Sequence, residues 1–362
     1  MKRHHLAKSL FMILLSMVLV LTGCAFPIWE QAASTTYAAT KKVDVSKLSN
    51  WSKLGNNYYY KKMTSAEKKF YKSLMVVCQE FLTDADVDAA KDKGRVEQPN
   101  GTEKLEVVYF TPFIPATGLS YSAASRVITV FCYSNPQYYF LDNGHLYSTG
   151  YSSSNSTDYA LTVYKAFAKG SSRMKHTKKL QSVLKRWTKK INKQDGQIEK
   201  LRMAQDLVCG RVTYGKSKYS QSAYSVFCGS KSVCAGYSSA FSMLSQVAGI
   251  NCINVTSEVV NNGTDYSHQW NMVKLNGHWY NVDVTWDDLD GQNYGGNTVC
   301  YYYYFLRDDQ NFIYDLNYQQ KTDSAYDSYY SHYAQEEFTH YGVPKANYDT
   351  NPAYPYTSPG AI

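Results

Sequence analysis

The sequence predicts an α+β protein, in which a mixed α/β N-terminal region is followed by a helix and a series of strands and hairpins. Apolar residues recur at helical spacing in several early segments, and from about residue 210 to about residue 320 one short helix gives way to strands and hairpins. An Asn-Gly pair at 276–277 is a strong local signal, because it is typical of two-residue hairpin turns. With 362 residues, the chain is long enough for a sizeable core and two packed regions.

An export signal occupies the N-terminus. A basic start is followed by an apolar run over about 10–21 and by Leu-Thr-Gly-Cys at 21–24. The run is shorter than the roughly 20 residues of a membrane span, and its ending resembles a bacterial lipobox. We therefore expect Cys24 to become the lipidated first residue of a lipoprotein on the extracytoplasmic face of a membrane. Cleavage near Ala38-Ala39 is the alternative, and it would give a freely secreted protein.

Composition divides the chain into five parts. Residues 1–24 are the signal peptide, and residues 25–50, small and polar without a hydrophobic period, are expected to be a flexible tether. A mixed α/β region over 51–195, a second folded domain over 196–320 and a tyrosine-rich extension over 321–362 complete the organisation. The 35 tyrosines suit half-buried strands and surfaces that bind saccharide or peptide, or they reflect a compositional habit of the organism.

The N-terminal folded region begins with a marked helix. Thr64 and Glu67 form a capping box, and apolar residues then continue at helical spacing: Phe70, Leu74, Val77 and Phe81. The stretch 128–141 mixes β-branched and aromatic residues around an Asn-Pro break. The region shows no chemical motif.

Two more helices follow. The segment 173–193 carries much of the formal charge of +8, with an apolar stripe of Leu180, Val183, Leu184, Trp187 and Ile191. Its basic face is expected to be solvated, and attraction to anionic envelope polymers or lipid headgroups is the alternative. No motif indicates nucleic-acid binding, and export argues against it. The second helix, 196–210, has an inner side of Ile198, Leu201, Gln205 and Val208.

The chain has eight cysteines. Six remain once Cys24 and Cys234 are set aside for lipidation and chemistry: Cys78, Cys132, Cys209, Cys228, Cys252 and Cys300. Export permits disulfides among them, and six cysteines allow 15 pairings that the sequence cannot distinguish. Cys78 and Cys209 lie on apolar helical patterns and are expected to be buried thiols.

A further helix is predicted over 234–248, with Gly249 as its stop. Its inward stripe consists of Ala235, Tyr237, Phe241, Leu244 and Ala248. Cys234 lies in the first turn, where unpaired amides and the helix dipole favour an anion such as a thiolate. Gly236 adds no side chain near the sulfur, so we expect a substrate backbone to approach closely.

The segment after this helix predicts a hairpin with a defined register. If the turn closes at Asn276-Gly277, the numbers of two residues opposite each other add up to 553. His268 and Asp283 then form a diagonal pair on one face of the sheet. A carboxylate that accepts from one imidazole nitrogen leaves the other to take a thiol proton. A three-residue turn would shift the register by one and move Asp283 to the wrong face.

Three tryptophans flank this hairpin. Trp270 and Trp279 share the face of His268 in the predicted register, and we expect them to shield the site and contact an acyl chain. Trp286 falls on the other face and is expected to lie in the core. The nearby polar run of Asp287, Asp288, Asp290 and Asn293 lacks the closing Glu of an EF-hand, so we interpret it as a polar turn and expect no metal or other cofactor.

Two stretches, VCAGYSSAFSMLSQVAGI at 233–250 and SHQWNMVKLNGHWYNVDVTWDD at 267–288, strongly resemble the transglutaminase-like fold in its bacterial cell-surface branch. This fold is a relative of the papain-type thiol proteases, and the resemblance covers about residues 200–310. NPQYYF at 135–140 is similar to an element that often precedes the domain. Gln269 stands where small residues are frequent in the family, which is a minor departure.

The resemblance implies a nucleophile helix packed on an antiparallel sheet. It makes Cys234 the nucleophile, His268 the base and Asp283 the orienting acid, and all three residue types are present. The backbone amide of Cys234 would be one oxyanion donor, and Tyr224 or Gln221 are candidates for a second. The candidates for contact with the substrate are Gly236, Tyr237, Trp270 and Trp279.

The function implied is that of an exported thiol enzyme acting on amide bonds through a thioacyl intermediate. It would be a peptidase or amidase, or would transfer the acyl group to an amine, with protein or peptide substrates such as cell-wall peptide. The alternative is a cell-surface module that keeps the fold and binds peptide or glycan without turnover. A disulfide between Cys228 and Cys234 would instead make the nucleophile candidate structural.

Overall fold

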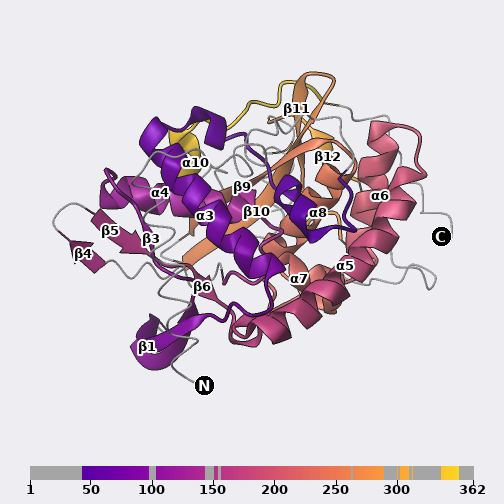
Figure 1. The fold of residues 1–362 in the computed structure, drawn as a ribbon. Coiled ribbons are helices and arrows are strands. Elements are labelled where there is room, and N and C mark those ends of the chain that lie inside the picture. The colour runs from indigo at the N-terminus through magenta and orange to yellow at the C-terminus, as the bar shows by residue number, and fades with distance from the viewer. Residues whose placement is uncertain are drawn as a thin grey trace. The chain divides into compact units, whose positions relative to one another are not determined.

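The computed structural model describes residues 43–97, 103–142, 151–153, 156–261, 264–288, 300, 302–309, 312 and 336–349. Cys24 and the expected signal peptide lie outside these ranges. Within them, no helix is long and apolar enough to cross a membrane. Figure 1 shows the arrangement of the elements.

In the described part of the chain, all helices but the last precede the long strands. Their bounds are η1 (Leu48–Leu54), η2 (Tyr60–Lys62), α3 (Ser65–Thr83), α4 (Tyr121–Ser134), η3 (Lys165–Phe167), α5 (Gly170–Asn192), α6 (Gln197–Cys209), α7 (Ala223–Cys228), α8 (Cys234–Val247) and α10 (Glu336–His340). The predicted capping box is present in α3: Glu67 N donates to Thr64 Oγ1, and Thr64 N donates to Glu67 Oε2. α4 ends directly before the Asn-Pro break, as expected where a proline disfavours helix in the residue before it.

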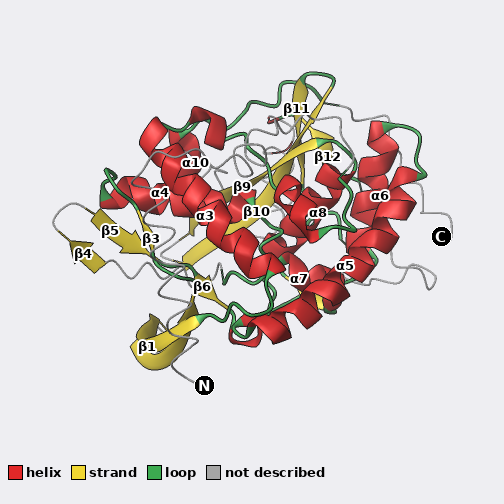
Figure 2. Ribbon diagram, in the orientation of Figure 1, coloured by secondary structure: helices red, strands yellow, loops and turns green. Residues whose placement is uncertain are grey.

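The principal sheet has the order β12-β11-β10-β9 and is antiparallel throughout. Its strands are β9 (Asn251–Asn261), β10 (Thr264–Leu275), β11 (His278–Val282) and β12 (Phe305–Arg307). The α+β class is therefore confirmed: Figure 2 shows helices gathered around the long strands β9 and β10.

Shorter strands form three further groups. The orders are β1-β2-β6 and β3-β5-β4, both antiparallel, and the parallel pair β7-β8. Their bounds are β1 (Ala90–Glu97), β2 (Glu103–Phe110), β3 (Ile114–Pro115), β4 (Tyr151–Ser153), β5 (Ser156–Tyr159), β6 (Thr162–Val163), β7 (Thr213–Tyr214) and β8 (Lys231–Ser232). The strands β3, β4 and β5 lie apart from the long strands (Figure 2).

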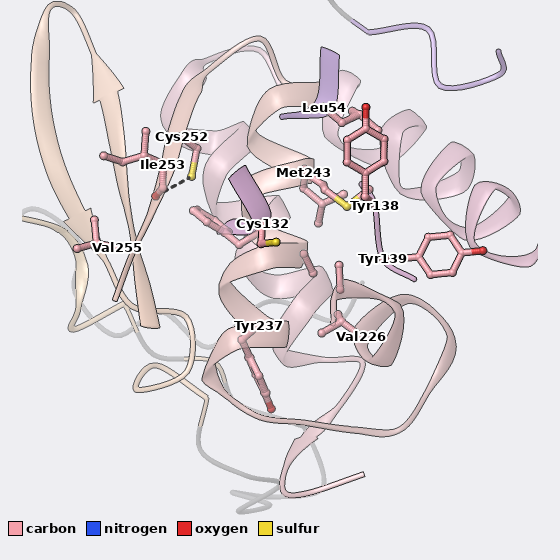
Figure 3. Packing of buried hydrophobic residues seen from close by; sticks show 14 of the residues in the cluster. Leu54, Cys132, Tyr138, Tyr139, Val226, Tyr237, Met243, Cys252, Ile253 and Val255 are labelled. Atoms are coloured by element: carbon pink, nitrogen blue, oxygen red, sulfur yellow. Dashed lines mark hydrogen bonds between the residues drawn. The ribbon is translucent and has the colours of Figure 1, made fainter. Parts of the chain in front are cut away.

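The centre of the core is α8. Every residue from Ala235 to Val247 is buried, because α8 contacts β9 and β10 as well as α6 and α7. The predicted apolar stripe is thus present, but the helix is enclosed on its remaining faces too. Figure 3 shows Leu54, Tyr138 and Met243, from distant parts of the sequence, meeting around this helix.

The N-terminal region and the region after it share this core. Ala39–Ile362 form one compact unit, and one hydrophobic cluster extends from Val43 to Ala346. The expected tether is too long at its C-terminal end, since Val43 and Val45 are buried and Trp51 donates its indole N–H to Val45 O. Ordered structure therefore begins before Trp51.

Part of the tyrosine-rich extension also belongs to the core. Phe338 on α10 is fully buried, and the Tyr341 hydroxyl donates to Glu67 Oε1 over 2.9 Å. This bond ties the described end of the extension to the first turn of α3. The predicted boundary at 320 therefore does not separate the extension from the fold.

The basic helix α5 has the predicted apolar stripe, and all but one of its lysines and arginines face solvent. Leu180, Leu184 and Ile191 are fully buried, whereas the lysines of the run are exposed. Arg173, counted with the basic run, is buried, and its guanidinium donates to backbone carbonyls including those of Phe81 and Phe167. This arginine therefore joins α5 to α3 rather than facing solvent.

Candidate active site

Cys234 is the first residue of α8. Val233 precedes it in an extended conformation as the N-cap, and no side chain caps the helix there. The first amides of a helix lack intrahelical acceptors, so the backbone N–H of Cys234 is placed to stabilise negative charge beside its own sulfur. Cys234 is half-buried, whereas every other residue of α8 is buried.

The hairpin that carries the other two candidates has the predicted register. Leu275 pairs with His278 and Asn271 pairs with Val282, and both pairs sum to 553. Asn276 and Gly277 have φ values of 49° and 88°, as a two-residue type I′ turn requires. The three-residue alternative is therefore excluded.

The register brings His268 and Asp283 together. His268 Nε2 lies 2.5 Å from Asp283 Oδ2, and the side chains are 15% and 1% exposed. The other carboxylate oxygen, Oδ1, accepts from the backbone N–H groups of Thr285 and Trp286, at 3.0 and 3.2 Å. The turn after β11 thus fixes the carboxylate against the imidazole.

The protonated form of His268 is strongly favoured. Burial alone would lower its pKa, but the charge of Asp283 and its hydrogen bond outweigh burial and, with a hydrogen bond to the Cys234 thiol, raise the pKa of His268 to about 10. The thiol of Cys234 thus lies near enough to the His268–Asp283 pair to influence the charge of the imidazole. A proton taken from Cys234 would therefore be held well by the imidazole.

Trp286 lies at the solvent side of this group, and its expected place in the core is wrong. It is 39% exposed, its ring packs edge-on against His268, and its Nε1 is 2.9 Å from His268 Nε2. One ring nitrogen cannot donate to Asp283 and accept from Trp286 in the same protonation state. The raised pKa of His268 favours donation to Asp283, which makes the indole a shielding neighbour. The strand β11 ends at Val282 and the chain then turns, so the alternation of faces that placed Trp286 in the core no longer applies there.

The two tryptophans expected at the substrate have other roles. Trp270 is buried, stacks on His268 and donates its indole N–H to Asn281 Oδ1. Trp279 packs on Tyr58, and it pairs with Lys274, six residues along β10 from His268. Six residues correspond to about 20 Å of strand. Trp279 therefore shares the face of the site without lying at it.

Gly236 and Tyr237 also face the interior rather than a substrate. A Cβ on Gly236 would lie 2.1 Å from Ser232 Oγ and 2.6 Å from Ser220 O, so the glycine permits close packing under α8. Tyr237 is fully buried, and its hydroxyl donates to Asp288 Oδ2 over 2.5 Å. The expectation of substrate contact is wrong for both residues.

The structure gives no support to Tyr224 as an oxyanion donor. Its hydroxyl lies 2.5 Å from His176 Nδ1, and its ring stacks on Tyr139. Gln221 is exposed directly before α7, and nothing in the described contacts joins it to Cys234. The helix-start amide of Cys234 therefore remains the one donor that we assign.

The acidic run after β11 supports the fold from inside. Asp287 is fully buried and accepts from Tyr304 N and Gln205 Nε2, at 2.9 and 2.8 Å. Asp288 accepts from Tyr237. In the described part of the chain, no group of His, Cys, Asp or Glu side chains is arranged to hold a metal ion; Asp290 and Asn293 lie outside that part.

Cys228 and Cys234 carry free thiols in separate surroundings. Cys228 ends α7, where its neighbours are Tyr224 and Lys179, whereas the thiol of Cys234 faces His268. Burial raises the pKa of Cys228 to about 11, an effect that Lys179 and Tyr224 only partly offset. The alternative disulfide between these two cysteines has no support here.

Comparisons with known proteins find one family and two solved structures that are similar to parts of this chain. The family model of the transglutaminase-like superfamily matches residues 185–284, which contain Cys234, His268 and Asp283. A cysteine protease candidate from Cytophaga hutchinsonii is 18% identical over 29% of this chain and 37% of its own, with a TM-score of 0.25.

A second solved structure, described as a TGase, is 13% identical over 41% of this chain and 45% of its own, with a TM-score of 0.27. This chain thus spans less than half of either solved protein. No curated protein sequence matches it. The similarity to the transglutaminase-like superfamily thus lies in residues 185–284.

Proposed function

We propose that the protein is a thiol enzyme that cleaves amide bonds through a thioacyl intermediate on Cys234. The observation that carries the proposal is the His268–Asp283 pair, with Nε2 2.5 Å from Oδ2, beside Cys234 in the first turn of α8. A nucleophile, a base and a group that orients the base are the parts that such chemistry needs.

The reaction follows from these positions. His268 holds the proton of the Cys234–His268 pair as an imidazolium, and the sulfur of Cys234 attacks the amide carbonyl. The Cys234 amide donates to the oxyanion while Asp283 stabilises the imidazolium. The imidazolium then gives its proton to the leaving amine, and a thioester remains on Cys234. Water releases the acid, or a second amine takes the acyl group.

Hydrolysis and transfer to an amine share every step up to the acceptor. We propose hydrolysis of protein or wall peptide as the main activity. Casein hydrolysis and incorporation of a fluorescent primary amine into casein distinguish the two outcomes.

Export and lipidation at Cys24 are part of the proposal. They are supported by the N-terminal sequence: a basic start, a short apolar run and Leu-Thr-Gly-Cys at 21–24. Intact-mass measurement of the membrane-extracted protein tests them. A diacylated or triacylated N-terminus at Cys24 is expected, and an unmodified N-terminus downstream of Cys24 would disprove lipidation.

The decisive first measurement is the rate of iodoacetamide labelling at Cys234 between pH 5 and 9. We expect labelling to be fast even at the acidic end of this range, and that rate to be lost in His268→Ala. His278→Ala is the matched control, because His278 is an exposed histidine at the other end of the same hairpin.

A binding module without turnover is the competing function. A pocket at the closed end of the hairpin favours it, since its lining includes Tyr58, Trp279, Asn56 and two lysines, Lys61 and Lys274. Slow labelling of Cys234 that is the same in His268→Ala would contradict the enzyme and support this module.

A further inference from the structure

Two cysteine sulfurs outside the candidate active site lie in direct contact. Cys209 ends α6, and Cys300 forms a β-bridge with Asp288; their Sγ atoms are 2.7 Å apart. Both residues are buried thiols. A disulfide bond is about 2.05 Å long, so the sulfurs need to approach by only about 0.7 Å. No other two cysteine sulfurs in the described part of the chain make a contact of this kind.

The contact lies within a chain of hydrogen bonds that ends at Asp283. Gln205, one turn before Cys209, lies 3.6 Å from Cys300 Sγ and donates to Asp287 Oδ2. Asp287 in turn accepts from Tyr304 N, and the carbonyl of Tyr304 accepts from Asp283 N over 3.0 Å. The cysteine pair therefore joins α6 to the segment that holds the candidate catalytic carboxylate.

We propose that Cys209 and Cys300 form an intramolecular disulfide that fastens this segment to α6. The inference does not depend on catalysis by Cys234. The cross-link closes a loop of about 90 residues, and loops of this length gain substantially from cross-linking because the unfolded chain loses freedom. It would hold the support of Asp283 in place without touching the reacting groups.

The chemistry requires a disulfide-containing oxidant. One cysteine thiolate attacks the oxidant's disulfide, forms a mixed disulfide and releases one thiol. The second cysteine thiolate then attacks the mixed disulfide and displaces the other thiol. Two electrons pass to the oxidant, and the two protons lost by Cys209 and Cys300 end on its thiols.

The surroundings favour bond formation during folding. Burial raises the pKa of both thiols, and contact between the two sulfurs adds to this for Cys209. The thiolates needed for exchange are therefore scarce once the fold has closed. The same burial would protect the finished disulfide from reductants, so we expect reduction to require unfolding.

Peptide mapping tests the bond directly. The full chain is refolded with oxidised and reduced glutathione, free thiols are blocked in denaturant, and the protein is digested with trypsin without reduction. Cys209 and Cys300 fall in peptides 203–211 and 275–307, each with a single cysteine. We expect these peptides to be joined, and dithiothreitol to separate them in denaturant but not in the folded protein.

Thermal unfolding supplies the second measurement. Loss of the cross-link should lower the midpoint of the oxidised wild type by about 5–10 °C, and Cys300→Ala should lose this difference between oxidised and reduced samples. Cys78→Ala is the matched control, because it removes another buried thiol and should retain the difference.

Two results would overturn the inference. One is complete alkylation of both Cys209 and Cys300 after oxidative refolding, and the other is a cross-link from either residue to a different cysteine. Both are obtained from wild-type protein, so poor folding of a variant cannot obscure them.

Discussion

The two ends of the β10–β11 hairpin have the same strand pairing and opposite surroundings. At the open end, the buried carboxylate of Asp283 holds His268 beside Cys234. At the closed end, Lys274 is exposed, and Trp279 packs on Tyr58. Side chains at both ends share one face of the sheet. The difference shows that alternation along a strand decides on which face of the sheet a side chain lies. Distance along the strand and the packing partners decide which of those side chains meet.

Asp283→Asn should remove the carboxylate that distinguishes the open end of the hairpin from the closed end, and it has the largest expected effect. The amide cannot stabilise the imidazolium, so we expect Cys234 alkylation at pH 7 to slow by about 10²-fold or more. Asp309→Asn is the control, because Asp309 accepts from Asn281 on the same hairpin. Equal rates in Asp283→Asn and the wild type would contradict the role given to Asp283.

The same variant has a defined effect on stability against pH. The pKa of His268 is about 10 in the fold and near 6.5 when unfolded. Because the folded value is the higher one, protonation stabilises the fold fully below about pH 6.5, and this contribution is lost as the pH rises through about 10. Denaturant unfolding should show the advantage of the wild type over Asp283→Asn shrinking across that window. NMR titration of His268 near or below pH 6.5 in the wild type would disagree.

Gly277→Val tests the turn that sets the register. Gly277 has a φ of 88°, and a β-branched residue there should cost about 1–3 kcal/mol of unfolding free energy. Asn276→Gly keeps the turn and should change stability by less. Denaturant unfolding measures both, and a valine variant as stable as the wild type would show that the turn does not require glycine.

Trp286→Ala should have a smaller effect at the open end. Removal of the indole admits water beside His268 and Asp283 and weakens their attraction. We expect the pKa of His268 to fall by less than about one unit, equivalent to about 1.4 kcal/mol. Trp286→Phe keeps a shielding ring and should titrate like the wild type. A clear rise in the phenylalanine variant would instead show that the indole N–H donates to the imidazole, because such a bond stabilises the unprotonated ring.

Trp279→Ala should have the smallest effect on the site. It removes the contact with Tyr58 and should destabilise the fold by about 1 kcal/mol. The alkylation rate of Cys234 and the titration of His268 should not change, because Trp279 lies at the closed end. Slower alkylation of Cys234 at unchanged stability would show that Trp279 contributes to the active site after all.

The sequence alone determined the local features of this protein. Thr64 and Glu67 mark the start of α3, and Asn276-Gly277 sets the hairpin register that pairs His268 with Asp283. Each of these features depends on residues close together in the chain or on the alternation of side chains along a strand, and both can be read from the sequence. The start of α8 at Cys234 is of the same kind.

Only the tertiary structure decided what surrounds these features. Gly236 faces Ser232, Tyr237 bonds to Asp288, and Trp286 turns onto His268. No period in the sequence records these contacts, because they join α8 to β8 and to the turn after β11, and that turn to β10. The contact of Cys209 with Cys300 also depends on tertiary packing. The two residues are 91 positions apart, and their sulfurs meet because Cys300, which forms a β-bridge with Asp288, lies against the end of α6.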